Sequence, residues 1–112
     1  MTRIILALTL WLGIGLTAIA EEAARSSDNP IIIGLNYPRT GHYKEEGLAQ
    51  MRGALLAIDE INKKGGLLGR QIKLINRDTA SRPEKAVPNV DSMIDEGAVM
   101  LFGSVSSAVA VA

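Results

Sequence analysis

The sequence of 112 residues contains no cysteine, one histidine and few aromatic side chains. The lack of cysteine excludes a disulfide framework, a thiolate metal site, a cysteine nucleophile and a lipid-modified N-terminal cysteine. A single histidine leaves too few ligands for an ordinary zinc site. One tryptophan, two tyrosines and one phenylalanine offer little for stacking nucleobases or for building an aromatic cage. The function therefore has to be sought in the layout of the chain.

The sequence also lacks an excess of charge of either sign. Twelve basic and twelve acidic side chains balance, whereas nucleic-acid-binding domains usually carry a basic excess. The sequence has neither a G-x-G-x-x-G motif nor a P-loop, so a nucleotide site would lack its usual phosphate cradle. We expect no metal, no cofactor and no nucleic-acid partner.

Residues 1–20 differ in character from the rest. Arg3 precedes an apolar run that ends in Ala18-Ile19-Ala20, which is the pattern of a secretory signal peptide. A membrane anchor is the alternative, but the run is at the lower limit of length for a bilayer span and contains glycines. The pattern favours cleavage after Ala20 and a periplasmic mature chain, led by a polar, disordered segment over residues 21–30.

From residue 31 onward, short apolar runs alternate with segments of helical spacing. The runs are continuous rather than alternating, as in strands buried on both faces. The pattern predicts strands over residues 31–36, 71–76 and 98–102, and helices over residues 45–64, from 81 to the glycine at 97, and over 108–112.

The first predicted helix has an apolar stripe that we expect to be buried. Acidic residues open this helix and lysines close it, which suits the helix dipole. Gly65-Gly66 is expected to form its left-handed C-terminal cap. The stripe consists of Leu48, Met51, Leu55, Ile58 and Ile61.

The second predicted helix begins with the sequence pattern of a capping box, in which Ser81 is the N-cap and Glu84 its partner. Pro88 then falls inside the helix, where it removes a backbone hydrogen bond at about 3 kcal/mol. We therefore expect a kink at Pro88.

Strand–helix connections of this length imply parallel strands joined by right-handed crossovers. The predicted fold is α/β, with three parallel strands in the order 2-1-3 and helices on both faces. Ligands of such sheets bind at the carboxyl ends of the strands, which selects the loops over residues 37–46 and 103–107. In the second loop, Ser104, Ser106 and Ser107 stand beside a helix start whose N–H groups suit an anion, unless one serine merely caps the helix.

The sequence shows no recognisable set of catalytic residues. His42 has no nucleophile near it and is interpreted as a loop residue. Asp78 follows the second strand and either forms a turn or bonds a neighbouring loop. No nucleophile–base–orienter set can be found, so we expect no enzyme; an exported esterase with Ser107 as its nucleophile is the alternative.

Residues 31–112 resemble the start of the branched-chain amino-acid type of periplasmic binding protein, the substrate-binding component of ABC importers. The most telling stretches are residues 57–62 (AIDEIN), 65–70 (GGLLGR), 77–79 (RDT), 83–87 (PEKAV) and 102–103 (FG). Each is weak alone, but their order and spacing together are specific.

The resemblance implies a Rossmann-like, type I lobe in a two-lobe protein that closes around an amino acid or amide. It implies that Ser106, Ser107 and Ala108 hold the carboxylate of the ligand and that Tyr43 and Glu46 line the same cleft. The partner would be an ABC permease in the inner membrane; a sensing subunit without transport is the alternative. Since family members are several times longer, we expect residues 31–112 to be the N-terminal part of lobe 1, a fragment that binds weakly alone.

Overall fold

The computed structural model describes residues 17–21, which are helical, and residues 28–112. Most of the predicted signal peptide and of the predicted lead-in lies outside the described residues. The chain enters the sheet through Asn29 and Pro30, whose carbonyl oxygens accept hydrogen bonds from the Arg70 guanidinium at 2.8 and 3.1 Å. Arg70 thereby ties the entry to the first strand to the segment before the second.

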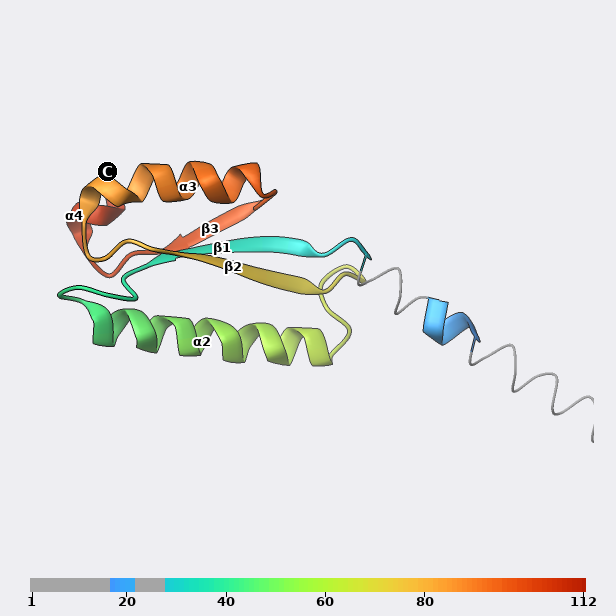
Figure 1. The fold of residues 1–112 in the computed structure, drawn as a ribbon. Helices are drawn as coiled ribbons and strands as arrows, with labels where there is room; N and C mark the ends of the chain where they lie inside the picture. The colour runs from blue at the N-terminus through green and yellow to red at the C-terminus, as the bar shows by residue number, and fades with distance from the viewer. Residues whose placement is uncertain (1–16, 22–27) are drawn as a thin grey trace, which may run out of the picture.

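A three-stranded parallel sheet forms the centre of the molecule (Figure 1). Its order is β2-β1-β3, and both neighbours run parallel to β1. The predicted order 2-1-3 is confirmed. The strands are β1 (Ile31–Tyr37), β2 (Ile72–Asp78) and β3 (Met100–Gly103).

Helices cover both faces of this sheet, as predicted. Figure 1 shows α2 on one face and α3 on the other, with α4 at the end to which the strands point. The α/β fold class is therefore confirmed. The helices are α2 (Lys44–Lys63), the 3₁₀ turn η1 (Pro83–Lys85), α3 (Ala86–Asp95) and the short α4 (Ser107–Ala110).

The core lies around the central strand. Leu35 on β1 and Met93 on α3 are fully buried, and each such side chain contributes about 1.5–3 kcal/mol to folding through loss of apolar surface to water. Asn36 and Thr79 are the buried polar side chains among the described residues. Both stand near the carboxyl ends of their strands, which places the buried polarity at one edge of the sheet.

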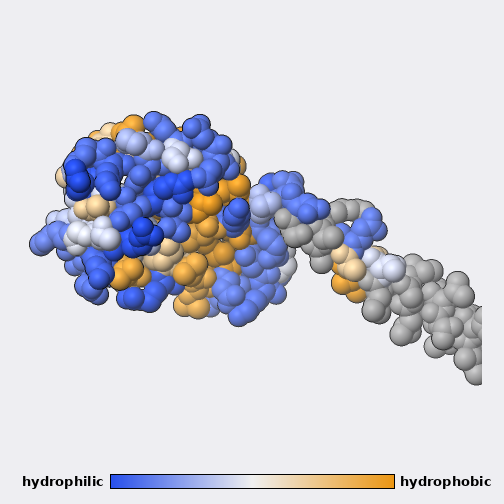
Figure 2. Space-filling model, viewed as in Figure 1, coloured by the Kyte–Doolittle hydropathy of each residue, from blue (hydrophilic) through white to orange (hydrophobic). Residues whose placement is uncertain are grey.

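The apolar stripe of α2 is buried less completely than predicted. Leu48, Met51 and Ile58 are half-buried, but Leu55 and Ile61 are 51% and 38% exposed. The prediction of a buried stripe is wrong for these two residues. Figure 2 shows apolar side chains gathered in a band between the two helical layers on the face viewed there.

The end of α2 has the predicted left-handed cap. Gly65 and Gly66 have φ of 102° and 80°, and their N–H groups donate to the carbonyls of Asn62 and Ile61 at 3.1 and 3.0 Å, which is the Schellman pattern. The Asn62 side chain then bonds both the N–H and the carbonyl of Ile72, at 2.8 and 2.9 Å. This pair of bonds fixes the end of α2 to the start of β2.

The start of α3 differs from the prediction. The α-helix begins at Ala86, after the 3₁₀ turn, so Pro88 lies in its first turn. The first N–H groups of a helix have no partner within it, and proline is tolerated there. The predicted loss of a hydrogen bond at Pro88 is therefore wrong.

The close approach of α2 to the loop after β1 gives the first testable prediction. Gly47 is buried, and a Cβ there would overlap the carbonyl oxygen of Pro38, whereas a Cβ at Gly53 in the same helix would meet nothing within 4 Å. We expect Gly47→Ala to lower the free energy of unfolding by about 1–3 kcal/mol through overpacking. Gly53→Ala should raise it by about 0.5–1 kcal/mol through helix propensity.

Urea unfolding followed by circular dichroism measures both variants. The two glycines share a helix, so propensity is matched between them. Equal shifts in the two variants would contradict the close packing of α2 on the Pro38 carbonyl.

Candidate functional site

The carboxyl ends of all three strands open at the same edge of the sheet (Figure 1). Two backbone hydrogen bonds tie the first residues of the flanking loops to the end of β1. Thr79 N–H donates to the Tyr37 carbonyl at 3.0 Å, and Ser104 N–H donates to the Asn36 carbonyl at 2.8 Å. The end of β1 thus anchors the chain that follows β2 and the chain that follows β3.

The loop after β3 contains the predicted serines. Ser104 has a positive φ of 67°, and its hydroxyl donates to the Ser106 carbonyl at 2.7 Å. Ser106 is the N-cap residue of α4, but its side chain makes no capping hydrogen bond. Capping therefore does not account for the Ser106 hydroxyl.

Ser106, Ser107 and Ala108 follow one another at this corner, the first half-buried and the other two exposed. The Ser106 carbonyl accepts the N–H groups of Val109 and Ala110 at 3.1 and 3.0 Å. Among the described residues, no hydrogen bond involves the hydroxyls of Ser106 and Ser107 or the N–H of Ala108. These donors are available to an anion.

The other two predicted residues lie where the loop after β1 meets α2. Tyr43 is half-buried at the N-cap position of α2, and the exposed Glu46 lies in the first turn. The His42 ring packs edge-on against the Tyr43 ring, with centroids 4.8 Å apart. The contacts of the exposed His42 are thus those of a loop residue.

Asp78, at the end of β2, binds this loop. Its Oδ1 accepts the N–H groups of Arg39, Thr40 and Ala80 at 2.9, 3.2 and 2.8 Å, and its Oδ2 accepts the Thr40 hydroxyl at 2.7 Å. Partial burial acts to raise the pKa of Asp78, but the bonds from Thr40, Ala80 and Arg39 outweigh it and hold the pKa below its ordinary value. Of the two predicted roles of Asp78, turn and neighbouring-loop contact, the structure has both.

Ser81 also binds the loop after β1 rather than capping a helix. Its hydroxyl accepts the Tyr43 N–H at 3.0 Å and donates to the Thr40 carbonyl at 3.2 Å. The N-cap of η1 is Arg82, whose Nε binds the Glu84 carboxylate at 2.6 Å. The predicted capping box of Ser81 and Glu84 is therefore wrong.

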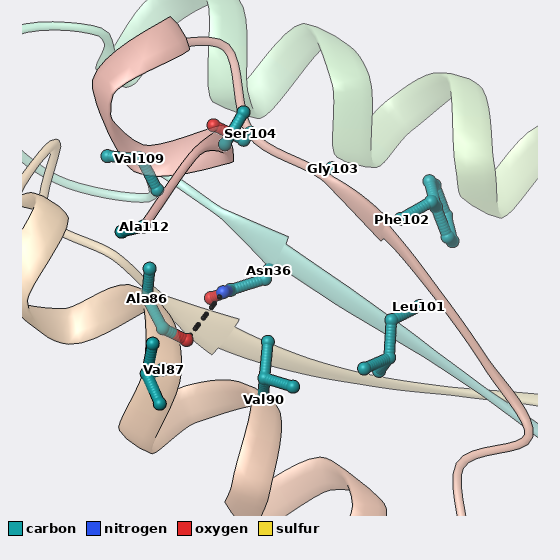
Figure 3. Close-up of a pocket in the computed structure, with 11 residues that line it drawn as sticks. Asn36, Ala86, Val87, Val90, Leu101, Phe102, Gly103, Ser104, Val109 and Ala112 are labelled. Carbon is teal, nitrogen blue, oxygen red and sulfur yellow. Dashed lines mark hydrogen bonds between the residues drawn. The ribbon is translucent and has the colours of Figure 1, made fainter.

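Asn36 joins β1 to α3 behind these loops. Its Nδ2 donates to the Ala86 carbonyl at 3.2 Å (Figure 3), and its Oδ1 accepts the Asn89 amide at 2.9 Å. Asn89 donates in addition to the Asp78 carbonyl at 3.1 Å. Each buried amide is paired, so this cluster is a framework for the edge.

A pocket of about 350 Å³ lies beside this framework, on the α3 side of the sheet. Figure 3 shows that it is walled mainly by apolar side chains, and none of the five predicted ligand residues lines it. The Asn36 amide at its side is already paired. A carboxylate would find few donors there, so the pocket is a poor site for one. The apolar walls include Val87, Val90, Leu101, Phe102 and Val109.

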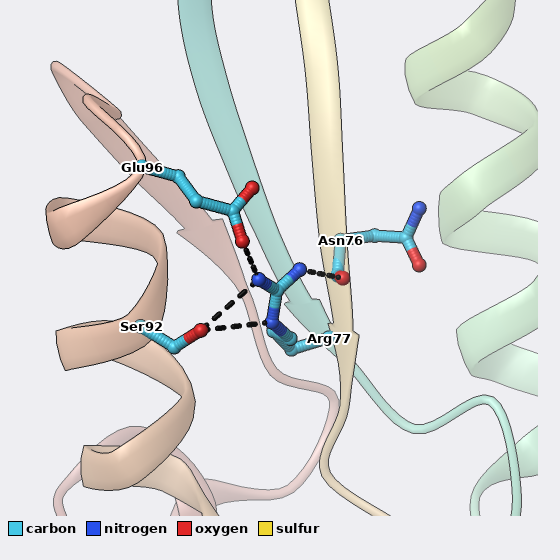
Figure 4. Close-up of polar contacts among 4 residues, drawn as sticks. All are labelled: Asn76, Arg77, Ser92 and Glu96. Carbon is cyan, nitrogen blue, oxygen red and sulfur yellow. Dashed lines mark hydrogen bonds and ion pairs between the residues drawn. The ribbon is translucent and has the colours of Figure 1, made fainter.

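Arg77 on β2 provides a further connection between β2 and α3 (Figure 4). Its guanidinium donates to the Ser92 hydroxyl at 3.0 and 3.2 Å and to the Asn76 carbonyl at 2.8 Å, and forms an ion pair with Glu96. All its contacts are within the fold. Arg77 is therefore a structural residue.

Over residues 17–21 and 28–112, no three His, Cys, Asp or Glu side chains are grouped so as to hold a metal ion. Within the same ranges, no helix has the length and apolarity needed to cross a membrane.

The family of the chain follows from its similarity to known proteins. Residues 30–112 match the family described as periplasmic binding protein. The chain belongs to this family. The family is one of substrate-binding proteins rather than enzymes.

Two relatives of this periplasmic binding protein domain are amino-acid-binding proteins by name. A Leu/Ile/Val-binding protein of Rhizobium johnstonii is 40% identical over 81 residues, which is 72% of this chain and 22% of the relative. A leucine-, isoleucine-, valine-, threonine- and alanine-binding protein of Pseudomonas aeruginosa is 37% identical over 91 residues, or 80% of this chain and 24% of the relative. The chain thus spans about a quarter of the length of these relatives.

Solved structures agree. The branched-chain amino acid transporter substrate-binding protein of Streptococcus pneumoniae, in complex with isoleucine, superposes with a TM-score of 0.71 at 30% identity. The match covers 73% of this chain and 24% of that one. A type 1 periplasmic binding protein of Bordetella pertussis gives a TM-score of 0.69 at 30% identity, covering 74% and 23%. The predicted resemblance is confirmed.

The predicted ligand residues fall into two groups in this periplasmic binding protein domain. Tyr43 and Glu46 lie at the start of α2 and Ser106–Ala108 at the start of α4, and no hydrogen bond between the two groups is found among the described residues. Sequence analysis missed the role of Ser81. The available signal was its position after β2, the strand next to β1, because loops at one edge of a parallel sheet are neighbours.

The carboxylate of Asp78 gives a prediction for the pH dependence of stability. A folded pKa below the ordinary 3.8 means that the fold favours the charged form, so its contribution is complete above that value and is lost as pH falls through the folded pKa. We expect Asp78→Asn to be less stable than wild type at pH 7, and the gap between them to close in acid below about pH 4.

Urea unfolding at pH 7, 5, 4 and 3 measures this gap. Asp91→Asn is the matched control, because Asp91 is exposed on α3 and makes no side-chain hydrogen bond in the described part of the chain. A gap that stays constant from pH 7 to pH 3 would show that the charge of Asp78 does not stabilise the loop.

Proposed function

We propose that this chain binds the carboxylate of an amino acid, as part of an extracytoplasmic solute-binding protein for ABC-type import. The observation that carries the proposal is the pair of hydroxyls of Ser106 and Ser107, which have no partner among the described residues and stand at the carboxyl edge of the parallel sheet. Such edges are where open α/β sheets bind ligands. The names of the relatives support an amino acid as the ligand.

The carboxylate would be held by neutral donors. Two hydroxyls and the Ala108 N–H can each donate one hydrogen bond to a ligand oxygen, and hydrogen bonds to a charged partner are stronger than those between neutral groups. The three residues are consecutive, so their donors belong to the same short stretch of chain at the start of α4. No lysine or arginine is required for this recognition.

The loop after β1 is proposed to provide the opposite polarity. Glu46 is an exposed acid at this edge, and its charge favours a ligand that carries an ammonium group, so we expect an α-amino acid rather than a neutral amide. The Tyr43 ring, half-buried beside it, provides an apolar and hydrogen-bonding surface. The two loops thus match the two charges of a zwitterion.

One edge of a sheet covers a ligand from one side only, whereas tight sites bury most of the ligand surface. We therefore propose that residues 31–112 are the first part of lobe 1 and that a second surface completes the site. The exposed Met100 on β3 and Val99 before it, at 53% and 75%, support a further segment that packs beside β3, since open apolar edges are usually covered.

Export is proposed to follow the signal peptide of residues 1–20, with cleavage after Ala20 and release into the periplasm. An ABC permease in the inner membrane would then receive the ligand. Uptake of labelled leucine by cells with and without the gene separates this role from sensing, because a sensing subunit would leave uptake unchanged.

The serine residues give the test of the proposed site. We expect Ser106→Ala and Ser107→Ala each to weaken binding of L-leucine, L-isoleucine or L-valine to the complete gene product by about 1–3 kcal/mol, the cost of a lost hydrogen bond to a charged group. Isothermal titration calorimetry measures the affinities.

Ser92→Ala is the matched control, because it removes a hydroxyl that binds Arg77 on the α3 side and should leave affinity unchanged. Unaltered affinity in both Ser106 and Ser107 variants would remove the carboxylate assignment. Hydrolysis of an ester by the wild type that disappears in Ser107→Ala would favour the esterase instead.

A further inference from the structure

The loops after β1 and β2 are bound to each other more extensively than either is to the loop after β3. Three bonds reach Asp78 from the backbone and hydroxyl of Arg39 and Thr40, and two more join Ser81 to Tyr43 and Thr40. By contrast, the loop after β3 is tied back to β1 through the Ser104 N–H. The turn of residues 78–81 is thus the support of the loop after β1.

This support has an unfavourable backbone conformation. Ala80 and Ser81 have φ of 51° and 59°, in the left-handed region that residues with a Cβ rarely adopt. Gly41 lies against Ala80, and a Cβ at Gly41 would overlap the Ala80 carbonyl oxygen. Two successive strained residues persist only where their surroundings over-determine them, and such strain gathers at functional sites.

The conformation has a specific consequence for Tyr43. It places the Ser81 hydroxyl 3.0 Å from the Tyr43 N–H. Tyr43 makes no side-chain cap for α2, and its carbonyl accepts the Gly47 N–H at 2.9 Å as the helix begins. The Ser81 hydroxyl therefore fixes, from a different loop, the residue at which α2 and its first turn begin.

We propose that Ser81 is a positioning residue for ligand binding, which acts through the Tyr43 backbone to set the place of Tyr43 and Glu46 at the edge of the sheet. The inference rests on the proposed function of that edge. Ser81 itself is not assigned a ligand contact. Its hydroxyl is engaged by Tyr43 and Thr40, so its effect on a ligand is indirect.

A positioning role predicts that a variant of Ser81 loses ligand affinity without losing stability, whereas a purely structural role predicts that both fall together. Ser81→Gly removes the hydroxyl and also relieves the left-handed strain, so we expect the melting temperature to stay near wild type while the affinity for L-leucine falls about 3- to 10-fold, the effect of one lost hydrogen bond. Ala80→Gly relieves the same kind of strain and keeps the hydroxyl. It should keep wild-type affinity.

Both variants introduce a glycine into the same pair of residues, so the added freedom of the unfolded chain is matched. Calorimetry and thermal unfolding are measured on the complete gene product, with Arg82→Ala as a control for the exposed ion pair of Arg82 and Glu84. Wild-type affinity in Ser81→Gly, or an equal loss in Ala80→Gly, would overturn the positioning role.

Amide hydrogen exchange distinguishes failure of the positioning role of Ser81 from failure of the proposed function. If the wild type binds none of the three branched-chain amino acids, the proposed function is overturned, and exchange still decides the inference. Ser81→Gly should speed exchange at residues 43–47 while Ala80→Gly leaves it unchanged. Equal exchange in the two variants would overturn the role of the Ser81 hydroxyl.

Discussion

The pairing of β1 with a parallel strand on each side is the constraint on which the rest of the structure depends. Residues 33–36 pair with β2 and β3 at once, so neither neighbour can shift along β1 without breaking a ladder. The carbonyls of Asn36 and Tyr37 continue that pairing into the loops through Ser104 and Thr79. Because all three strands are parallel, these loops emerge at one edge.

Polar side chains at that edge divide into two kinds. Asp78, Ser81, Asn36 and Asn89 form hydrogen bonds with one another and with backbone groups. The hydroxyls of Ser106 and Ser107 have no partner in the part of the chain that the structure describes. Unpaired donors are tolerated where water or a ligand can reach them, and the exposed Ser107 meets that condition. The engaged group forms the frame of the edge, and Ser106 and Ser107 are the residues that we propose for ligand recognition.

The sequence predicted the elements and their order well, because these follow from local features. Continuous apolar runs marked the buried strands, Gly65-Gly66 marked the end of α2, and the length of the crossovers implied the parallel order. The loop-to-loop bonds could not be found in this way. Tyr43 and Ser81 are 38 residues apart, and no local pattern specifies which backbone N–H a serine hydroxyl will accept.

The errors have a common cause, which is competition between local and tertiary partners. Ser81 and Glu84 satisfy the local spacing of a capping box, yet the loop after β1 engages the hydroxyl and Arg82 engages the carboxylate. Leu55 and Ile61 satisfy the helical spacing of a buried stripe, yet both side chains are exposed. Local patterns predict what a residue can do, and the neighbouring strands decide which of these contacts forms.

The stretches that carry the family resemblance are mostly framework. Asn62 holds α2 to β2, Arg70 holds the entry to β1, Arg77 holds β2 to α3, and Asp78 holds the loop after β1. A chain that keeps these contacts keeps the sheet edge, whatever ligand it binds. We therefore propose that the choice of ligand depends on residues outside those stretches, among them Tyr43, Glu46 and the Ser106–Ala108 corner.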